Sequence, residues 1–258
     1  MSLALGGILD YPRIFAVLSV VVLWLSAQFG VSFHRRRPLQ DAEREDFGVV
    51  QTATLTLLGL IIGFTFSMAI VRYDLRKHYE EEEANAIGTE YFRAGLLSDG
   101  DAALLRFQLR KYLGLRIAFY HAGAGSELRR INTDTAQLQT EMWHSVETPA
   151  RAQETPVKAL VVSGMNDVLN SQGYTQAAWW NRIPVAAWGL LAFIAIGCNF
   201  LVGYGAHGAG VRAGLLIVLP LIVATSFLLI ADIDCPYHGL IHVIPQNLIS
   251  LSESLRTR

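Results

Sequence analysis

The sequence predicts an all-α membrane protein with four transmembrane helices and a helical extramembrane region between the second and third span. Three observations support this fold class. The mean hydropathy is +0.33, and 52% of the residues are hydrophobic. Only 17% are charged, whereas soluble proteins average about 25%. Four long stretches contain no charged residue at all.

These four uncharged stretches are long enough to cross a bilayer, whose apolar core of about 30 Å needs roughly 20 helical residues. They are residues 14–33, 47–71, 183–206 and 213–231. No clean cleavage site follows the first stretch, so we interpret it as a span and not as a signal peptide. An even number of spans places both termini on the same side of the membrane.

The region between the second and third span, residues 72–182, is predicted to be helical. One row of its side chains recurs every three or four residues, as on one face of a helix: Leu105, Leu109, Tyr112, Leu113, Arg116 and Tyr120. Two further helices are expected at residues 131–146, ending before Pro149, and at residues 156–171, ending before Gly173. A C-terminal tail, residues 232–258, follows the last span.

The middle helices also carry apolar side chains on more than one face, including Leu105, Leu109, Leu113 and Phe119. One chain of this size is not expected to bury them all. We therefore expect a homo-oligomer.

Several function classes are disfavoured by composition and motifs. The net charge is −1, so nucleic acid is not an expected partner, because its binding requires a basic face. The chain has no glycine-rich phosphate loop, no Ser-His-Asp pattern and no HExxH. We therefore expect no enzymatic activity and no cofactor.

The second span continues into a charged segment without a break. No proline interrupts residues 57–88, and no glycine lies between Phe64 and Ile87. Residues four apart share a helix face, so Thr56, Leu60 and Phe64 form a row. This row continues to Asp74 or Leu75 and then to His78 and Glu82. Such a row could line a pore, because apolar rings gate by dewetting and carboxylate rings select cations. Alternatively, the four glutamates at residues 80–83 form an ordinary solvated face.

Two stretches carry a resemblance to a known family. The segment GFTFSMAIVRY, residues 63–73, resembles the second-span motif of the bestrophin channels. Two longer stretches are similar to bacterial bestrophin-like proteins. They are FSMAIVRYDLRKHYEEEEANAIGTEYFRAGLL, residues 66–97, and DIDCPYHGLIHVIPQNLISL, residues 232–251. The order of spans and helical regions is similar over most of the chain, and the specific sequence motifs cover about 50 residues.

The resemblance implies a homopentamer in the inner cell membrane, with one central pore lined by the second span. A hydrophobic neck would lead into a vestibule formed by the middle helices, which places residues 72–182 and both termini in the cytosol. Positive charges near the spans are nearly balanced between the two sides, so they do not decide this orientation.

Individual positions of the neck follow from the same resemblance. Gly63 and Phe64 match the Gly-Phe pair of the neck. Leu60 stands where the family has an aromatic residue, and Thr56 stands where it has a β-branched apolar residue. The upper neck is therefore expected to be softer and more polar than the neck of the bestrophin channels. The acidic run after the last span is reduced to Asp232 and Asp234, so calcium gating is not expected.

Asp74 and Glu82 continue the row below the neck, on the cytosolic side. The family's animal channels pass chloride, but rings of these carboxylates should concentrate cations and repel anions. We therefore expect a monovalent cation preference, with inorganic ions and the lipid bilayer as partners.

One further cluster contains side chains that bind metals. Asp232, Asp234, His238 and His242 lie within the segment DIDCPYHGLIH, and carboxylate with imidazole suits zinc, manganese or iron. The competing interpretation is a loop in which the aspartates cap backbone amides. For the whole protein, the alternative to a channel is a non-conducting membrane scaffold or sensor whose middle domain binds a partner.

Overall fold

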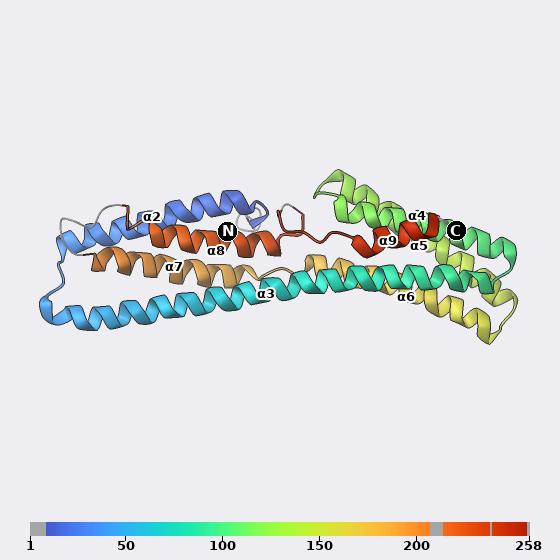
Figure 1. Ribbon diagram of the computed structural model, residues 1–258, viewed down its shortest axis with the longest axis horizontal. Helices are drawn as coiled ribbons and strands as arrows, with labels where there is room; N and C mark the ends of the chain where they lie inside the picture. Colours follow the sequence, from blue (N-terminus) through green and yellow to red (C-terminus); the bar gives the residue numbers. More distant parts are fainter. Residues whose placement is uncertain (1–8, 207–213, 238, 257–258) are drawn as a thin grey trace. The chain divides into compact units, whose positions relative to one another are not determined.

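The computed structural model of this chain describes residues 9–206, 214–237 and 239–256. Within these ranges the chain forms helices and no strand (Figure 1), which confirms the all-α prediction. The chain divides into two compact units. The first consists of Met1–Val71 and Arg182–Ile241, and the second of Arg72–Asn181 and His242–Arg258.

The first unit contains the most apolar helices. They are α2 (Pro12–Arg36), the first part of α3 (Arg44–Arg93), α7 (Val185–Gly205) and α8 (Val218–Asp234), with the short helix η1 (Asp41–Glu43) before α3. Figure 1 shows α2 alongside α7 and α8, with which it packs.

Small residues allow α2 and α7 to approach closely. A Cβ atom added at Gly30 would collide with the backbone oxygen of Phe200, and one added at Gly203 would collide with that of Ala27. Close backbone contact through glycine and alanine is typical of helix pairs in membranes, where apolar burial drives association less than it does in water.

Three helical stretches in the described residues are long and apolar enough to cross a membrane: Pro12–Arg36, Arg44–Leu96 and Pro156–Gly205. The predicted fourth span, residues 213–231, overlaps α8, which has 17 residues. Residue 213 lies outside the described residues. The arrangement with four spans therefore stays a prediction.

The second unit contains the remaining helices of the described part of the chain. It contains the rest of α3, then η2 (Ala94–Leu96), α4 (Asp99–His121), α5 (Ser126–Ala152), α6 (Pro156–Trp180) and α9 (Gln246–Arg256). The predicted row of α4 is confirmed, because all six of its side chains are buried. The oligomer argument from this unit was wrong, since Leu105, Leu109, Leu113 and Phe119 are at most 1% exposed within one chain.

Two predicted helix ends were also wrong. Helix α5 continues through Pro149 and ends at Ala152. A proline so near the end interrupts only the last turn, and its ring is buried. Helix α6 continues through Gly173 to Trp180, because Thr175 and Trp179 beyond the glycine are buried. Packing outweighs the low helix propensity of a single glycine.

Candidate functional site

Helix α3 is a single helix of 50 residues from Arg44 to Arg93. Its residues up to Val71 belong to the first unit and the remaining residues to the second. The prediction of an unbroken helix through residues 57–88 is therefore confirmed. Every position along it can be assigned to a face by helical periodicity alone.

The four predicted neck residues share the uncovered face of α3. Thr56 and Gly63 are exposed, and Leu60 and Phe64 are 53% and 63% exposed. A Cβ atom added at Gly63 would meet no atom within 4 Å. The hydroxyl of Thr56 donates to the carbonyl of Thr52 at 2.9 Å, so its one donor is used within the helix, while its oxygen can still accept a hydrogen bond.

The opposite face of the same helix is covered. Leu58, Thr65 and Ala69 are at most 6% exposed, and Arg76 further along is 2% exposed. The Nε of Arg76 donates to the carbonyl of Ala178 at 3.4 Å. Arg76 therefore lies on the covered face of α3.

The exposed row continues below the neck through acidic residues. Asp74, His78 and Glu82 are all exposed. His78 Nε2 lies 3.3 Å from Glu82 Oε1 within one helical turn. We define the exposed α3 row as Thr56, Leu60, Gly63, Phe64, Ser67, Val71, Asp74, His78 and Glu82.

The four glutamates at residues 80–83 divide between the two faces. Glu81 and Glu82 are exposed, whereas Glu80 is 1% and Glu83 is 0% exposed. The solvated-face interpretation therefore holds for two of the four residues only. The helical period explains this division. Glu80 and Glu83 are three residues apart and share one face of α3, whereas Glu81 and Glu82 point away from that face.

Glu83 accepts a hydrogen bond from Arg116 of α4, and both side chains are fully buried. Thr175 of α6 also donates to Glu83, at 3.2 Å. Burial has the largest single effect on the pKa of Arg116 and lowers it. The charge and hydrogen bond of Glu83, together with Tyr112 and Tyr120, raise the pKa above its ordinary value. Arg116 lies in the row of α4 that the sequence analysis identified, although the sequence did not indicate its partner.

Glu80 holds the first turn of α9. Its carboxylate accepts from the backbone N–H of Leu248 at 2.9 Å and from the side-chain amide of Asn247 at 2.6 Å. The N-terminal turn of a helix has free N–H groups and a partial positive charge, which a carboxylate stabilises. This glutamate thus has a structural contact and is not available to the exposed row.

The aspartates of the possible metal cluster bind backbone amides. Asp232 accepts from the N–H groups of Leu240 and Ile241, both at 2.8 Å. Asp234 accepts from Ile183 N–H at 3.1 Å and lies 3.5 Å from the Nε of Arg182. These contacts agree with the capping interpretation.

Only one of the two histidines of that cluster can be placed. His238 lies outside the described residues, and His242 is exposed. Within residues 9–206, 214–237 and 239–256, no three His, Cys, Asp or Glu side chains gather as a metal ion requires.

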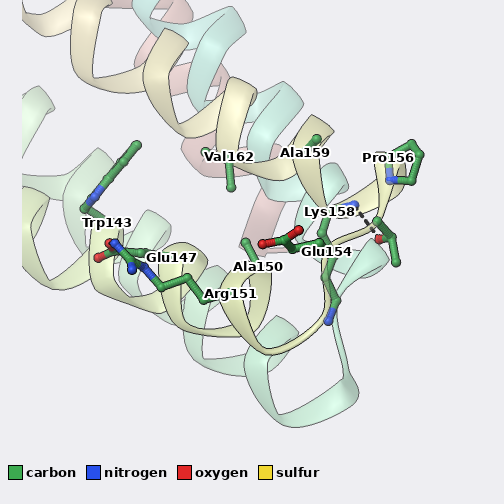
Figure 2. Close-up of a pocket in the computed structure, with 10 residues that line it drawn as sticks. Trp143, Glu147, Ala150, Arg151, Glu154, Pro156, Lys158, Ala159 and Val162 are labelled. Carbon is green, nitrogen blue, oxygen red and sulfur yellow. Dashed lines mark hydrogen bonds and ion pairs between the residues drawn. The ribbon is translucent and has the colours of Figure 1, made fainter.

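A separate cavity of about 650 Å³ lies between α5 and α6 where the two helices meet (Figure 2). Two of its charged side chains, Arg151 and Lys158, have partners nearby. Arg151 pairs with Glu147 at 2.6 Å, and Lys158 donates to the carbonyl of Pro149 at 3.0 Å. These contacts hold the two cationic side chains to neighbours within the chain, and the cavity does not indicate a specific ligand.

Comparison with models of protein families shows to which family the chain belongs. The model of the Bestrophin-like domain matches residues 14–248, which includes all of α3 and the aspartates at the end of α8. This chain belongs to the Bestrophin-like domain family. It is a membrane protein, as its apolar helices also indicate.

Solved structures share the fold of this Bestrophin-like chain at low sequence identity. One mutant of a bacterial bestrophin homologue from Klebsiella pneumoniae has a TM-score of 0.63 and 12% identity, covering 95% of this chain and 98% of that chain. Another structure of this homologue has a TM-score of 0.61 and 13% identity, covering 93% and 98%. No curated protein matches this Bestrophin-like chain.

Proposed function

We propose that this protein is an oligomeric ion channel of the inner cell membrane whose pathway is lined by the exposed α3 row. One observation supports this most strongly: the same face of a single helix stays uncovered from Thr56 to Glu82. A helix that only anchors a chain in lipid has no reason to keep that face uncovered beyond the bilayer. A row that lines an axial pathway has such a reason.

Symmetry would turn the row into rings. Homo-oligomers are most often closed and rotationally symmetric, and the family resemblance favours five chains. Leu60 and Phe64 would then form apolar rings, which gate by dewetting. Thr56, Gly63 and Ser67 are small or weakly polar, unlike the large aliphatic residues expected on a face that only contacts lipid.

The acidic part of the row supports a preference for monovalent cations. Asp74 and Glu82 would each contribute one carboxylate per chain, and such rings attract cations. Lys77 is exposed nearby and opposes this effect. Arg76 does not compete, because it is buried against α6.

In this arrangement the region of residues 72–182 and both termini face the cytosol, and the chain crosses the membrane four times. The proposed activity is passive ion passage and not catalysis, and it uses no cofactor.

The deciding experiment is single-channel recording. Purified protein is incorporated into planar bilayers with a KCl gradient, and currents are compared with those of protein-free bilayers. We expect discrete unitary currents. Folded, inserted protein that never conducts would contradict the proposal and favour the non-conducting scaffold or sensor.

A further inference from the structure

A carboxyl group without a partner is buried on the covered face of α3. Glu90 is 0% exposed. Neither of its carboxylate oxygens has a hydrogen-bond partner among the described residues. Burial without a partner penalises the charged form of a carboxyl group far more than the neutral form. Glu83, seven residues earlier on the same helix, differs because Arg116 neutralises it.

Glu90 occupies a space that exists because residue 164 of α6 is glycine. A Cβ atom at Gly164 would collide with Oε2 of Glu90 and would lie 2.5 Å from Nη1 of Arg93. The carboxyl group therefore lies in the contact between α3 and α6. A change of charge at this point acts directly on the packing of the two helices.

Charged groups on three helices surround this position. On α3, Arg93 donates to the carbonyl of Leu160 at 3.4 Å and lies 3.8 Å from Asp167 of α6. On α4, Arg106 donates to the carbonyl of Tyr91 at 3.3 Å. The two arginines thus contact groups other than Glu90.

These surroundings act on Glu90 in different directions. Burial raises the pKa of Glu90 to about 8, while the positive charge of Arg93 lowers it and the negative charge of Asp167 raises it. The effect of burial is the largest of the three.

We propose that Glu90 is a proton-binding switch in the contact between α3 and α6. The carboxyl group keeps its proton while the two helices are packed around Gly164. At alkaline pH the O–H bond breaks and the proton passes to water. The resulting carboxylate attracts Arg93 away from the Leu160 carbonyl and repels Asp167, which loosens the contact. This inference does not depend on ion conduction.

The direction of the stability change follows from proton linkage. Between the ordinary value of 4.5 and about 8, the folded protein holds a proton on Glu90 that the unfolded chain has released. The contribution of Glu90 to stability is therefore complete below pH 4.5 and is lost as the pH rises through about 8.

The proton itself is tested by infrared titration of the purified protein. The difference between the parent and Glu90→Gln isolates the band of a protonated carboxyl group. We expect this band to persist at neutral pH and to disappear with a midpoint near 8. Asp167→Asn should move the midpoint to lower pH, and Arg93→Gln to higher pH. Loss of the band near 4.5 in the parent would overturn the proposal.

The effect on packing is tested by thermal unfolding between pH 5 and 9. The parent midpoint should fall by several degrees as the pH rises. Glu90→Gln mimics the neutral form and should remove that part of the fall, whereas the exposed control Glu81→Gln should keep it. Hydrogen exchange of α6 around Gly164, corrected for intrinsic base catalysis, should accelerate above pH 8 in the parent only. Equal pH profiles for the parent and Glu90→Gln would refute the switch.

Discussion

Glu83 of α3 and Arg116 of α4 form an ion pair in which neither side chain has any exposed surface. The guanidinium carbon of Arg116 also lies 4.4 Å from the centre of the Phe119 ring, which favours a cation through its negative face. The two residues are 33 positions apart in the sequence, and their pair joins α3 to α4. The pair therefore holds α3 against α4 within the second unit.

The first prediction concerns the stability contributed by this pair. Removing one partner leaves the other charge buried and unpaired, which costs about 3–5 kcal/mol. Glu83→Gln and Arg116→Met should each lower the unfolding midpoint in detergent, and the double variant should lose less than the sum. Glu147→Gln, which breaks an exposed pair with Arg151, is the control and should change little. Additive losses in the double variant would argue against direct coupling.

The second prediction concerns the neck. Phe64→Ala and Leu60→Ala should each raise the open probability, because a smaller apolar ring is easier to wet. The matched control is Phe193→Ala on α7, since Phe193 is also exposed, at 76%, but lies on another helix. Single-channel recording measures the effect. The assignment fails if the α3 variants behave as the parent does, or if the α7 variant opens the channel equally.

The third prediction concerns ion selectivity. In a KCl gradient the parent should reverse near the potassium equilibrium potential. The double variant Asp74→Asn with Glu82→Gln should shift toward chloride, because both carboxylate rings are neutralised. Glu127→Gln, an exposed carboxylate at the start of α5, should not shift. A parent reversal potential at the chloride value would reject the cation preference.

The fourth prediction concerns assembly. The reason to expect it is now the exposed apolar surface of the second unit, where Phe92 is 54%, Leu104 is 50% and Phe107 is 60% exposed. We expect five chains by native mass spectrometry in mild detergent. Phe107→Asp should weaken the assembly, whereas Ser126→Asp at the exposed start of α5 should not. A parent protein that is monomeric under these conditions would contradict this expectation.

The fifth prediction concerns orientation. Ser126 and Ser254 are exposed, and single cysteines placed there should be protected from membrane-impermeant reagents in intact cells. The native Cys198 and Cys235 are buried, at 0% and 1% exposure, so background labelling should be low. Labelling of either site from outside the cell would contradict the proposed topology.

Local sequence patterns were sufficient for the all-helical class, for the unbroken course of α3 and for the composition of the exposed row. The spacing of Thr56, Leu60 and Phe64 determines that they share a face of α3, because helical geometry repeats with every turn. The absence of proline and the scarcity of charge likewise predicted a long apolar helix. These properties depend on neighbours within a few residues.

Only the tertiary structure decided which side chains are covered and by what. The sequence presents Glu80, Glu81, Glu82 and Glu83 as one charged run, yet two of them are buried against α4, α6 and α9. The partners Arg116 and Leu248 lie far along the chain, so their pairing depends on how the helices pack. Packing also carries α5 through Pro149 and α6 through Gly173, because buried contacts further along outweigh local propensity. For the same reason, the isolation of Glu90 became visible only where Gly164 of a distant helix lies against it.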